Sequence, residues 1–368
     1  MQRKELLGAT LLASAGLLFA ATAARADAIS DAKAYVAKVT APVTTWDGPT
    51  TGPKDVGHKL IVVVSTDQRN GGARGVAEGI QEAAKIMGWD VRLIDGQGSV
   101  NARAEGISQA VSLKADGLVL DAIDAAEQAT ATAAAEKAGI KVVGWHSGPK
   151  PGPMPKFGIF TNITTDPLEV AKAAASYAVA NSDGKAGVVI FTDSAYAIAI
   201  AKSDEMARVI KACSTCTLLS VEDTPLADAA NRMPSLTTSL LTRFGAKWTY
   251  GLSINDLTFD FMAPALQAAG IGGGDPPHAI SAGDGSEPAF QRIKSGEYQI
   301  GTVAEPLRLH GWQEVDELNR AFAGVPPSGY VAPPHLFIKA NIDRDGGPKN
   351  IYDPQNGYTE AYRKIWGK

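Results

Sequence analysis

Short runs of apolar residues alternate, from residue 59 onward, with segments whose apolar residues recur every three or four positions. The run KLIVVVS at 59–65 is continuous, as expected for a strand that is buried on both faces of a sheet. The segment after it places Val76, Ile80 and Ala83 on one face of a helix. This alternation predicts an α/β protein with parallel sheets and helices on both faces of each sheet.

The alternation occurs twice along the chain. In the first run we expect strands at residues 59–65, 89–95, 116–121, 140–145 and 157–161, and helices that include 101–114 and 125–138. In the second run we expect helices at 167–181, 197–212, 228–243, 257–269 and 287–295, and strands at 186–192, 217–223, 247–253, 278–284 and 298–304. Two similar runs in a chain of this length predict two similar lobes.

The first 26 residues have the three parts of a secretory signal peptide. Arg3 and Lys4 form a basic start, residues 6–24 are apolar apart from small polar residues, and the sequence ARA precedes a cleavage point after Ala26. Cleavage after Ala28 is the close alternative. A membrane anchor is the other interpretation, but the apolar part is short for a span, which needs about 20 residues. We therefore expect export, and a mature chain of 368 − 26 = 342 residues.

Two further segments lie outside the alternating pattern. Residues 27–56 begin with a predicted helix at 29–39 and continue as a Pro-, Gly- and Thr-rich lead-in. The tail at 343–368 begins with the turn-rich sequence DRDGGPKN and ends with a predicted short helix near 358–366. We expect an N-terminal extension and a C-terminal tail at these places.

The charge balance argues against a nucleic-acid partner. The whole chain has a formal net charge of −4. The predicted signal peptide holds three basic residues and one acidic residue, a net of +2, so the mature chain carries −4 − 2 = −6. A nucleic-acid-binding protein would instead present a basic face.

Cys213 and Cys216 are the only cysteines of the sequence, in KACSTC. An exported protein meets an oxidising compartment, where two cysteines this close can form a local disulfide. Free thiols and a redox pair are the alternatives, although a redox motif places its first cysteine at the start of a helix and this pair follows one. A metal site would need further ligands nearby, and we expect no metal.

Polar residues gather where the predicted strands end. In open parallel sheets, ligands bind beyond the carboxyl ends of the strands. The candidate binding residues at these ends are Asp67, Gln68, Arg69, Asn70, Trp145, His146, Tyr196, Asn255, Asp256, Asp284 and Glu305. Carboxylates and amides bind hydroxyl groups, and an aromatic ring covers the C–H face of a sugar, so this set favours a small hydroxylated ligand.

The glycines after the first strand do not form a phosphate-binding motif. Gly71, Gly72 and Gly75 lie too late and at the wrong spacing for Gly-x-Gly-x-x-Gly, and no Walker lysine motif is present. Asp67 would also repel a phosphate. The sequence therefore favours a neutral or cationic ligand, and we expect no cofactor.

Four short motifs carry a resemblance to a known family. In the order IVVVST, SINDL, SAGDGS and GTVAEP, over residues 57–342, the chain resembles the ribose-type (type I) periplasmic solute-binding proteins of sugar ABC importers. The resemblance implies two Rossmann-like lobes joined by a three-crossover hinge. It also implies lobe 1 at 57–163, completed by 306–333, and lobe 2 at 164–305, completed by 334–342.

The resemblance also implies roles for single residues. Asn255, Asp284 and Glu305 fall where relatives place hydrogen-bonding groups, residues 67–70 fall in the first-lobe ligand loop, and Trp145 with His146 falls where relatives often have an Asp-Arg pair. Lys202 lies near a position often held by a ligand-binding Arg. Each position has a structural alternative: Asp256 as a cap of helix 257–269, Glu305 as a hinge partner, Arg69 as a solvated rim charge, Trp145 as core and Tyr196 as plain surface.

The function implied by the resemblance is capture of a sugar or polyol between closing lobes in the periplasm. The implied partner is an ABC permease of the inner membrane, engaged transiently by a monomer. A receptor that feeds a chemoreceptor or sensor kinase is an alternative, as is a nucleoside-like or amino-substituted ligand. A secreted carbohydrate-active enzyme is a further alternative, because Asp284 and Glu305 could form a carboxylate pair, although no hydrolase motif is present.

Overall fold

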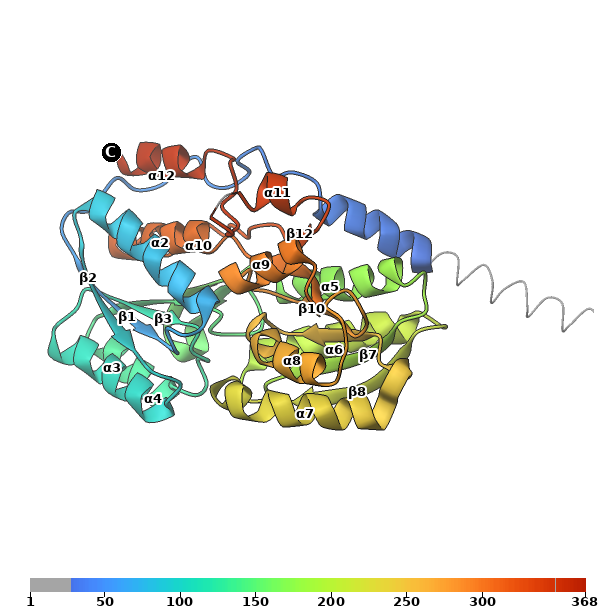
Figure 1. Cartoon of the computed structure of the whole chain (residues 1–368). Helices are drawn as coiled ribbons and strands as arrows, with labels where there is room; N and C mark the ends of the chain where they lie inside the picture. Colours follow the sequence, from blue (N-terminus) through green and yellow to red (C-terminus); the bar gives the residue numbers. More distant parts are fainter. Residues whose placement is uncertain (1–27, 348) are drawn as a thin grey trace, which may run out of the picture.

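In the computed structural model, which describes residues 28–347 and 349–368, the chain folds into two α/β lobes that lie side by side (Figure 1). Each lobe is built on a six-stranded, mostly parallel sheet. This confirms the predicted fold class. The predicted signal peptide at 1–26 lies outside the described residues. No helix within the described part of the chain has the length and apolar character needed to cross a membrane.

Lobe 1 holds the first sheet, with strand order β2-β1-β3-β4-β6-β5. All its neighbours are parallel except β5 and β6. The strands are β1 (Leu60–Ser65), β2 (Asp90–Asp95), β3 (Gly117–Asp121), β4 (Lys141–Trp145), β5 (Gly152–Met154) and β6 (Ile159–Ile163). The helices of this lobe are α2 (Gly71–Met87), α3 (Val100–Ser112), α4 (Ala129–Lys137), the short η1 (Pro155–Phe157) and α10 (Leu307–Ala323).

Lobe 2 holds the second sheet, with strand order β12-β11-β10-β9-β7-β8, in which β12 is antiparallel to β11. The strands are β7 (Gly187–Thr192), β8 (Thr217–Asp223), β9 (Tyr250–Ser253), β10 (His278–Ser281), β11 (Gln299–Ala304) and β12 (His335–Ile338). The helices are α5 (Pro167–Asn181), α6 (Ala197–Ala212), η2 (Leu226–Asp228), α7 (Ala229–Phe244), η3 (Gly245–Lys247), α8 (Leu257–Ala268), α9 (Glu287–Ser295) and α11 (Ile342–Asp345).

Three segments of this alternating region connect the lobes. The chain leaves the first sheet after β6, returns from β11 to α10, and crosses again between α10 and β12. The parallel strands of each sheet therefore end near these crossings, and their carboxyl ends face the other lobe.

The apolar strands are buried on both faces, as their sequence predicts. In β1, Ile61 and Val63 pack with α2 and α10 on one face, while Val62 and Val64 pack with α3 on the other. All four side chains are fully buried. A continuous apolar run is therefore needed here, because both faces of the sheet are covered.

The N-terminal extension and the C-terminal tail wrap around both lobes. Residues 28–39 form a helix against lobe 2, where the Tyr35 hydroxyl donates to Glu169 Oε2 at 2.5 Å. The chain then runs across to lobe 1, where the Trp46 ring lies 5.4 Å from that of Tyr362. The tail ends in α12 (Tyr358–Trp366), which packs on α10 (Figure 1). Together these segments bury the side of α10 that would otherwise face water.

Three local details differ from the sequence-based expectation. Helix α4 begins at Ala129 and not at residue 125, because residues 125–128 form a turn, next to which Ala126 N donates to Asp124 Oδ1 at 2.9 Å. Strand β5 and helix α11 were not expected, since each spans only three or four residues. Elements this short leave no periodic pattern in a sequence.

Candidate functional site

A hollow lies between the lobes at the carboxyl ends of the strands. It encloses about 480 Å³ of empty space, counted to its open mouth. We call it the inner hollow. Its lining residues are Thr66, Asn70, Ala122, Trp145 and His146 of lobe 1 and Tyr196, Ile198, Ala199, Lys202, Leu226, Ile254, Asn255 and Asp284 of lobe 2.

Direct contacts join the lobes around this hollow. The Tyr196 hydroxyl lies 3.2 Å from Thr66 Oγ1, and Ala197 N donates to Asp124 Oδ2 at 3.0 Å. At the start of α2, a Cβ on Gly72 would lie only 2.6 Å from Asp284 Oδ2, so this position has no room for a side chain. The structure is therefore a closed arrangement of the two lobes.

Asp284 presents the most distinctive group in the hollow. Its side chain is 7% exposed, and its carboxylate accepts no hydrogen bond from any residue in the described ranges. Burial raises the pKa of Asp284 to about 6, although the charge of Lys202 opposes the shift. A carboxylate that lines a hollow and has no partner among the described residues is available to accept hydrogen bonds from a ligand.

Asp256 holds Asp284 in place and does not itself line the hollow. Its Oδ2 accepts hydrogen bonds from the backbone N–H groups of Asp284, Gly285 and Ser286 at 3.1, 2.8 and 3.0 Å. Its Oδ1 accepts from Gln299 Nε2 at 2.8 Å and from the Ser281 hydroxyl. The protein therefore occupies the acceptor positions of Asp256 in this structure, and its role as a ligand contact stays a prediction.

Asn255 and Asn70 each combine a local role with a position in the hollow. Asn255 Oδ1 accepts from Leu257 N at 3.2 Å. Asn70 Oδ1 accepts from Gly72 N and Ala73 N and so caps α2. In both residues the amide nitrogen donates to no other described residue, so both have donors available inside the cleft.

Glu305 lies beneath the hollow and ties the crossings together. Its Oε1 lies 3.0 Å from His146 Nε2 and 3.6 Å from Lys202 Nζ. Its Oε2 accepts from Thr165 N at 3.2 Å. Burial alone would raise the pKa of Glu305, but His146 and Lys202 hold that pKa well below its ordinary value. Glu305 is 1% exposed and does not line the hollow, so this geometry favours the alternative of a hinge partner, and its role as a ligand contact stays a prediction.

Trp145 and His146 form one wall of the hollow. Their rings stack at 3.7 Å between centroids, with an interplanar angle of 14°. Trp145 Nε1 donates to His310 Nδ1 at 3.1 Å. Burial lowers the pKa of His310 to about 4, so His310 is neutral near pH 7 and acts as an acceptor for the indole. One face of Trp145 is therefore taken by His146 and is closed to a ligand.

The predicted loop at 67–70 divides between several roles. Arg69 forms an ion pair with Asp67, with Nη2 2.5 Å from Oδ2, and both residues lie outside the inner hollow. Gln68 Nε2 donates to Ser65 Oγ at 2.7 Å, and Gln68 N donates to Asp95 Oδ1 at 3.1 Å. Gln68 does not line the hollow, because these contacts hold it within lobe 1.

Several lining residues were not predicted. Thr66, Ala122 and Ile254 directly follow β1, β3 and β9, so their positions after a strand end were a usable signal. The buried Arg103 supports Thr66, since its Nη1 donates to Thr66 Oγ1 at 3.1 Å while its Nε and Nη2 bind Glu127. Residue type hid Ala122 and Ile254, because apolar residues suggest no ligand chemistry by themselves, and Arg103 lies in the first turn of α3, away from the strand ends.

His146, Asp284 and Glu305 together offer three atoms of the kind that bind metal ions. One ligating atom from each lies within 4.8 Å of the others. The ammonium of Lys202 already places a positive charge 3.6 Å from Glu305. A metal ion here would have to displace both this charge and the His146 hydrogen bond.

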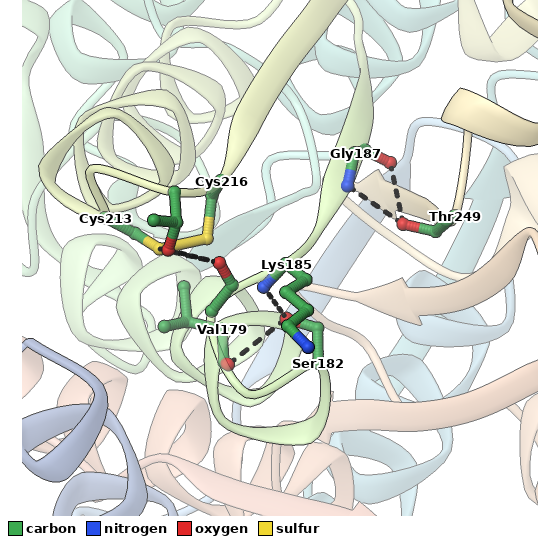
Figure 2. The surroundings of a disulfide bond; sticks show 9 residues. Val179, Ser182, Lys185, Gly187, Cys213, Cys216 and Thr249 are labelled. Carbon is green, nitrogen blue, oxygen red and sulfur yellow. Dashed lines mark hydrogen bonds between the residues drawn. A yellow bond between two sulfur atoms is a disulfide. The ribbon is translucent and has the colours of Figure 1, made fainter. Parts of the chain in front are cut away.

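The disulfide lies away from the cleft. Cys213 and Cys216 are bonded, with 5.3 Å between their Cα atoms, at the junction of α6 and β8. Figure 2 shows the bond beside the turn that contains Ser182 and Lys185. It closes a local loop in lobe 2 and touches no residue of the hollow.

Comparisons with known proteins agree with this architecture. Residues 61–324 match the family model described as a periplasmic binding protein domain. No protein with curated annotation matches the chain in sequence.

Solved structures share the fold at low sequence identity. A galactofuranose-binding protein is 15% identical with a TM-score of 0.67, covering 84% of this chain and 99% of its own. A solute-binding protein of an ABC transporter from Agrobacterium vitis, with bound allitol, is 18% identical with a TM-score of 0.66, covering 78% of this chain and 98% of its own. A sugar ABC transporter protein from Yersinia enterocolitica is 17% identical with a TM-score of 0.69, covering 84% and 96%.

Proposed function

The chain belongs to the periplasmic binding protein family, and from this premise we propose that it captures a sugar or polyol between its lobes for an ABC importer. The carrying observation is the Asp284 carboxylate, which lies in a hollow that both lobes line and accepts no hydrogen bond from the described residues. Similar structures include proteins described as bound to allitol and as binding galactofuranose. The match in fold supports the same class of ligand here.

The chemistry of the hollow suits several hydroxyl groups. The Asp284 carboxylate accepts hydrogen bonds, and the free amide nitrogens of Asn255 and Asn70 donate them. A hydroxyl both donates and accepts, so a polyol can satisfy all of these groups at once. Apolar residues such as Ile198 and Ile254 line the remaining surface and suit the C–H groups of a sugar.

Closure is the step that makes capture selective. Asn70 lies on lobe 1, and Asn255 and Asp284 lie on lobe 2, so a ligand that binds them all bridges the cleft. Such a ligand stabilises the closed form relative to the open form, because only the closed form offers both sets of contacts. The three crossings act as the hinge, and a permease of the inner membrane recognises the closed surfaces.

The protein acts as a binding protein and carries out no catalysis in this proposal. A glycoside hydrolase would need two carboxyl groups facing the bond that is cleaved. Glu305 is held ionised by His146 and Lys202 and lies outside the hollow, so among the described residues that line the inner hollow Asp284 is the single carboxylate. Export by the signal peptide at residues 1–26 and a periplasmic location belong to the same proposal.

Isothermal titration calorimetry against a panel of sugars and polyols tests the proposal. The panel contains allitol, D-allose, D-tagatose, L-arabinose and galactofuranosides, with citrate and amino acids as unrelated solutes. We expect saturable binding of at least one polyol or sugar with one ligand per chain. Absence of binding across the sugars and polyols would contradict the proposal.

A further inference from the structure

A second hollow adjoins the inner one. We call it the outer hollow; it encloses about 540 Å³ to its mouth. The two hollows share Thr66, Asn70, Tyr196 and Leu226. The two hollows are therefore adjacent within the cleft, and Thr66 and Tyr196, whose hydroxyl oxygens lie 3.2 Å apart, belong to the lining of both.

One wall of the outer hollow is apolar. Leu257 and Phe261 lie one helical turn apart on α8, and Leu226 and Ala230 lie around the start of α7. Phe261 packs against the lobe 2 core with part of its ring and is only partly buried. This wall favours an apolar group of a ligand, because burying apolar surface against it is favourable. It offers no hydrogen-bond partner to a hydroxyl group.

The opposite wall carries a planar guanidinium whose charge is already balanced. Arg69 Nε lies 3.0 and 3.1 Å from the two carboxylate oxygens of Asp67, and Nη2 lies 2.5 Å from Oδ2. The side chain of Arg69 is nevertheless 73% exposed. Asp67 binds the N–H edge of the Arg69 guanidinium, so the flat face of the guanidinium is available to stack on an aromatic ring.

We propose that the outer hollow binds a flat, uncharged, apolar group attached to the hydroxylated ligand, so that the protein takes a glycoside with an aromatic aglycone. This inference rests on the proposed sugar function of the inner hollow. The apolar wall and the Arg69 face favour an aromatic ring, while the internal pairing of Asp67 with Arg69 leaves no free charge to hold an ionic group. A bare monosaccharide fills only the inner hollow.

Calorimetry with matched ligands tests this proposal. The pairs are the methyl and phenyl glycosides of D-allose, of galactofuranose and of L-arabinofuranose. For the sugar that binds, we expect the phenyl glycoside to bind roughly ten-fold more tightly than the methyl glycoside, the scale of one aromatic contact. Adenosine and inosine form a separate arm that tests whether a nucleoside supplies the ring.

Two variants locate the effect. Ala230→Trp fills the outer hollow and is expected to remove the advantage of the phenyl glycoside. Ser239→Trp adds the same side chain to an exposed position further along α7 and is expected to keep the advantage. Circular dichroism of both variants checks that they fold.

The outcomes separate this inference from the proposed function. If methyl glycosides bind and phenyl glycosides bind no better, or if Ala230→Trp keeps the advantage, the outer hollow is an open mouth only and the inference is overturned while the function stands. If no glycoside and no free sugar binds, the proposed function is overturned and the inference falls with it.

Discussion

Asp284 in the cleft and Asp316 of α10 are both buried acidic residues, but their surroundings differ. The carboxylate of Asp284 lines the inner hollow and accepts no hydrogen bond from the described residues. The carboxylate of Asp316, on α10, accepts hydrogen bonds from Arg320 Nε at 2.7 Å and from Trp366 Nε1 of α12 at 2.8 Å. The chain itself supplies the partners of Asp316, whereas the carboxylate of Asp284 faces a hollow and is available to a ligand.

Helix α10 of lobe 1 is covered by two segments that lie outside the family match, the N-terminal extension and α12. We call this packing the joint. Asn319 Nδ2 donates to Pro53 O at 3.1 Å, and Arg320 Nη2 donates to Thr51 O at 2.8 Å. The indole of Trp366 stacks on Trp312 at 5.6 Å. Asp316, Asn319 and Arg320 of α10 therefore hold the N-terminal extension and α12 in place.

The largest expected effect is a loss of stability when the packing of α12 on α10 is weakened. Trp366→Ala removes the side chain of a residue that is 1% exposed, and we expect the free energy of unfolding to fall by about 3–5 kcal/mol. Urea denaturation followed by circular dichroism measures the change, with Trp366→Phe as a milder control that keeps a ring. Sugar affinity of the folded variant should remain unchanged. A variant with wild-type stability would contradict the structural role, and one with weakened binding would contradict the separation of joint from cleft.

The next effect tests the cleft. Asp284→Asn removes the charge from the facing carboxylate, and we expect ligand affinity to fall about 100-fold, since hydrogen bonds to charged groups contribute about 1.5–3 kcal/mol. Thermal stability without ligand should be unchanged or higher, because an unpartnered buried charge is removed. Calorimetry and a thermal melt measure the two quantities. Wild-type affinity in this variant would show that Asp284 does not bind the ligand.

A smaller effect follows from the pKa of Asp284. Because burial raises that pKa to about 6, the carboxylate takes up a proton as the pH falls through 6. We expect affinity to fall roughly ten-fold between pH 7.5 and pH 5, since the protonated group loses its charge. For the free protein the sign is opposite. A raised carboxyl pKa makes Asp284 contribute less stability as pH rises from about 4 to 6.

Calorimetric titrations at a series of pH values measure this dependence. Asp284→Asn is the matched control, and its affinity should not change over the same range through this group. An equal pH dependence in the wild type and the variant would assign the effect to other titrating groups.

The smallest expected effect concerns Gln68, which the sequence predicts as a binding residue but which does not line the inner hollow in the structure. Gln68→Ala removes the hydrogen bond to Ser65 Oγ, so we expect a stability loss of about 0.5–1.5 kcal/mol. Ligand affinity should stay within about two-fold of the wild type, a difference that calorimetry resolves. A loss of ten-fold or more would return Gln68 to the binding site.

The strands and the position of the cleft could be predicted from sequence because they depend on local patterns. The continuous apolar run of β1 and the polar residues after β4 and β10 needed no knowledge of the rest of the fold. The structure brings seven of the predicted site residues to the inner hollow: Asn70, Trp145, His146, Tyr196, Lys202, Asn255 and Asp284.

The remaining assignments depended on tertiary contacts that no local pattern reveals. Asp256 and Asp284 are both acidic residues near strand ends, yet the carboxylate of Asp256 turns into the loop at 283–286 while that of Asp284 faces the hollow. Glu305 was separable from a ligand contact only through His146 and Thr165, which are distant in sequence. The burial of α10 was likewise hidden, because segments from both ends of the chain cover it.

A crystal structure of the protein with the tightest sugar or polyol of the panel tests the central claim most directly. The account predicts the ligand in the inner hollow, with hydroxyl groups within hydrogen-bonding distance of Asp284 and Asn255 on one lobe and of Asn70 on the other. A ligand bound elsewhere, or bound to one lobe alone with Asp284 still unpartnered, would contradict it.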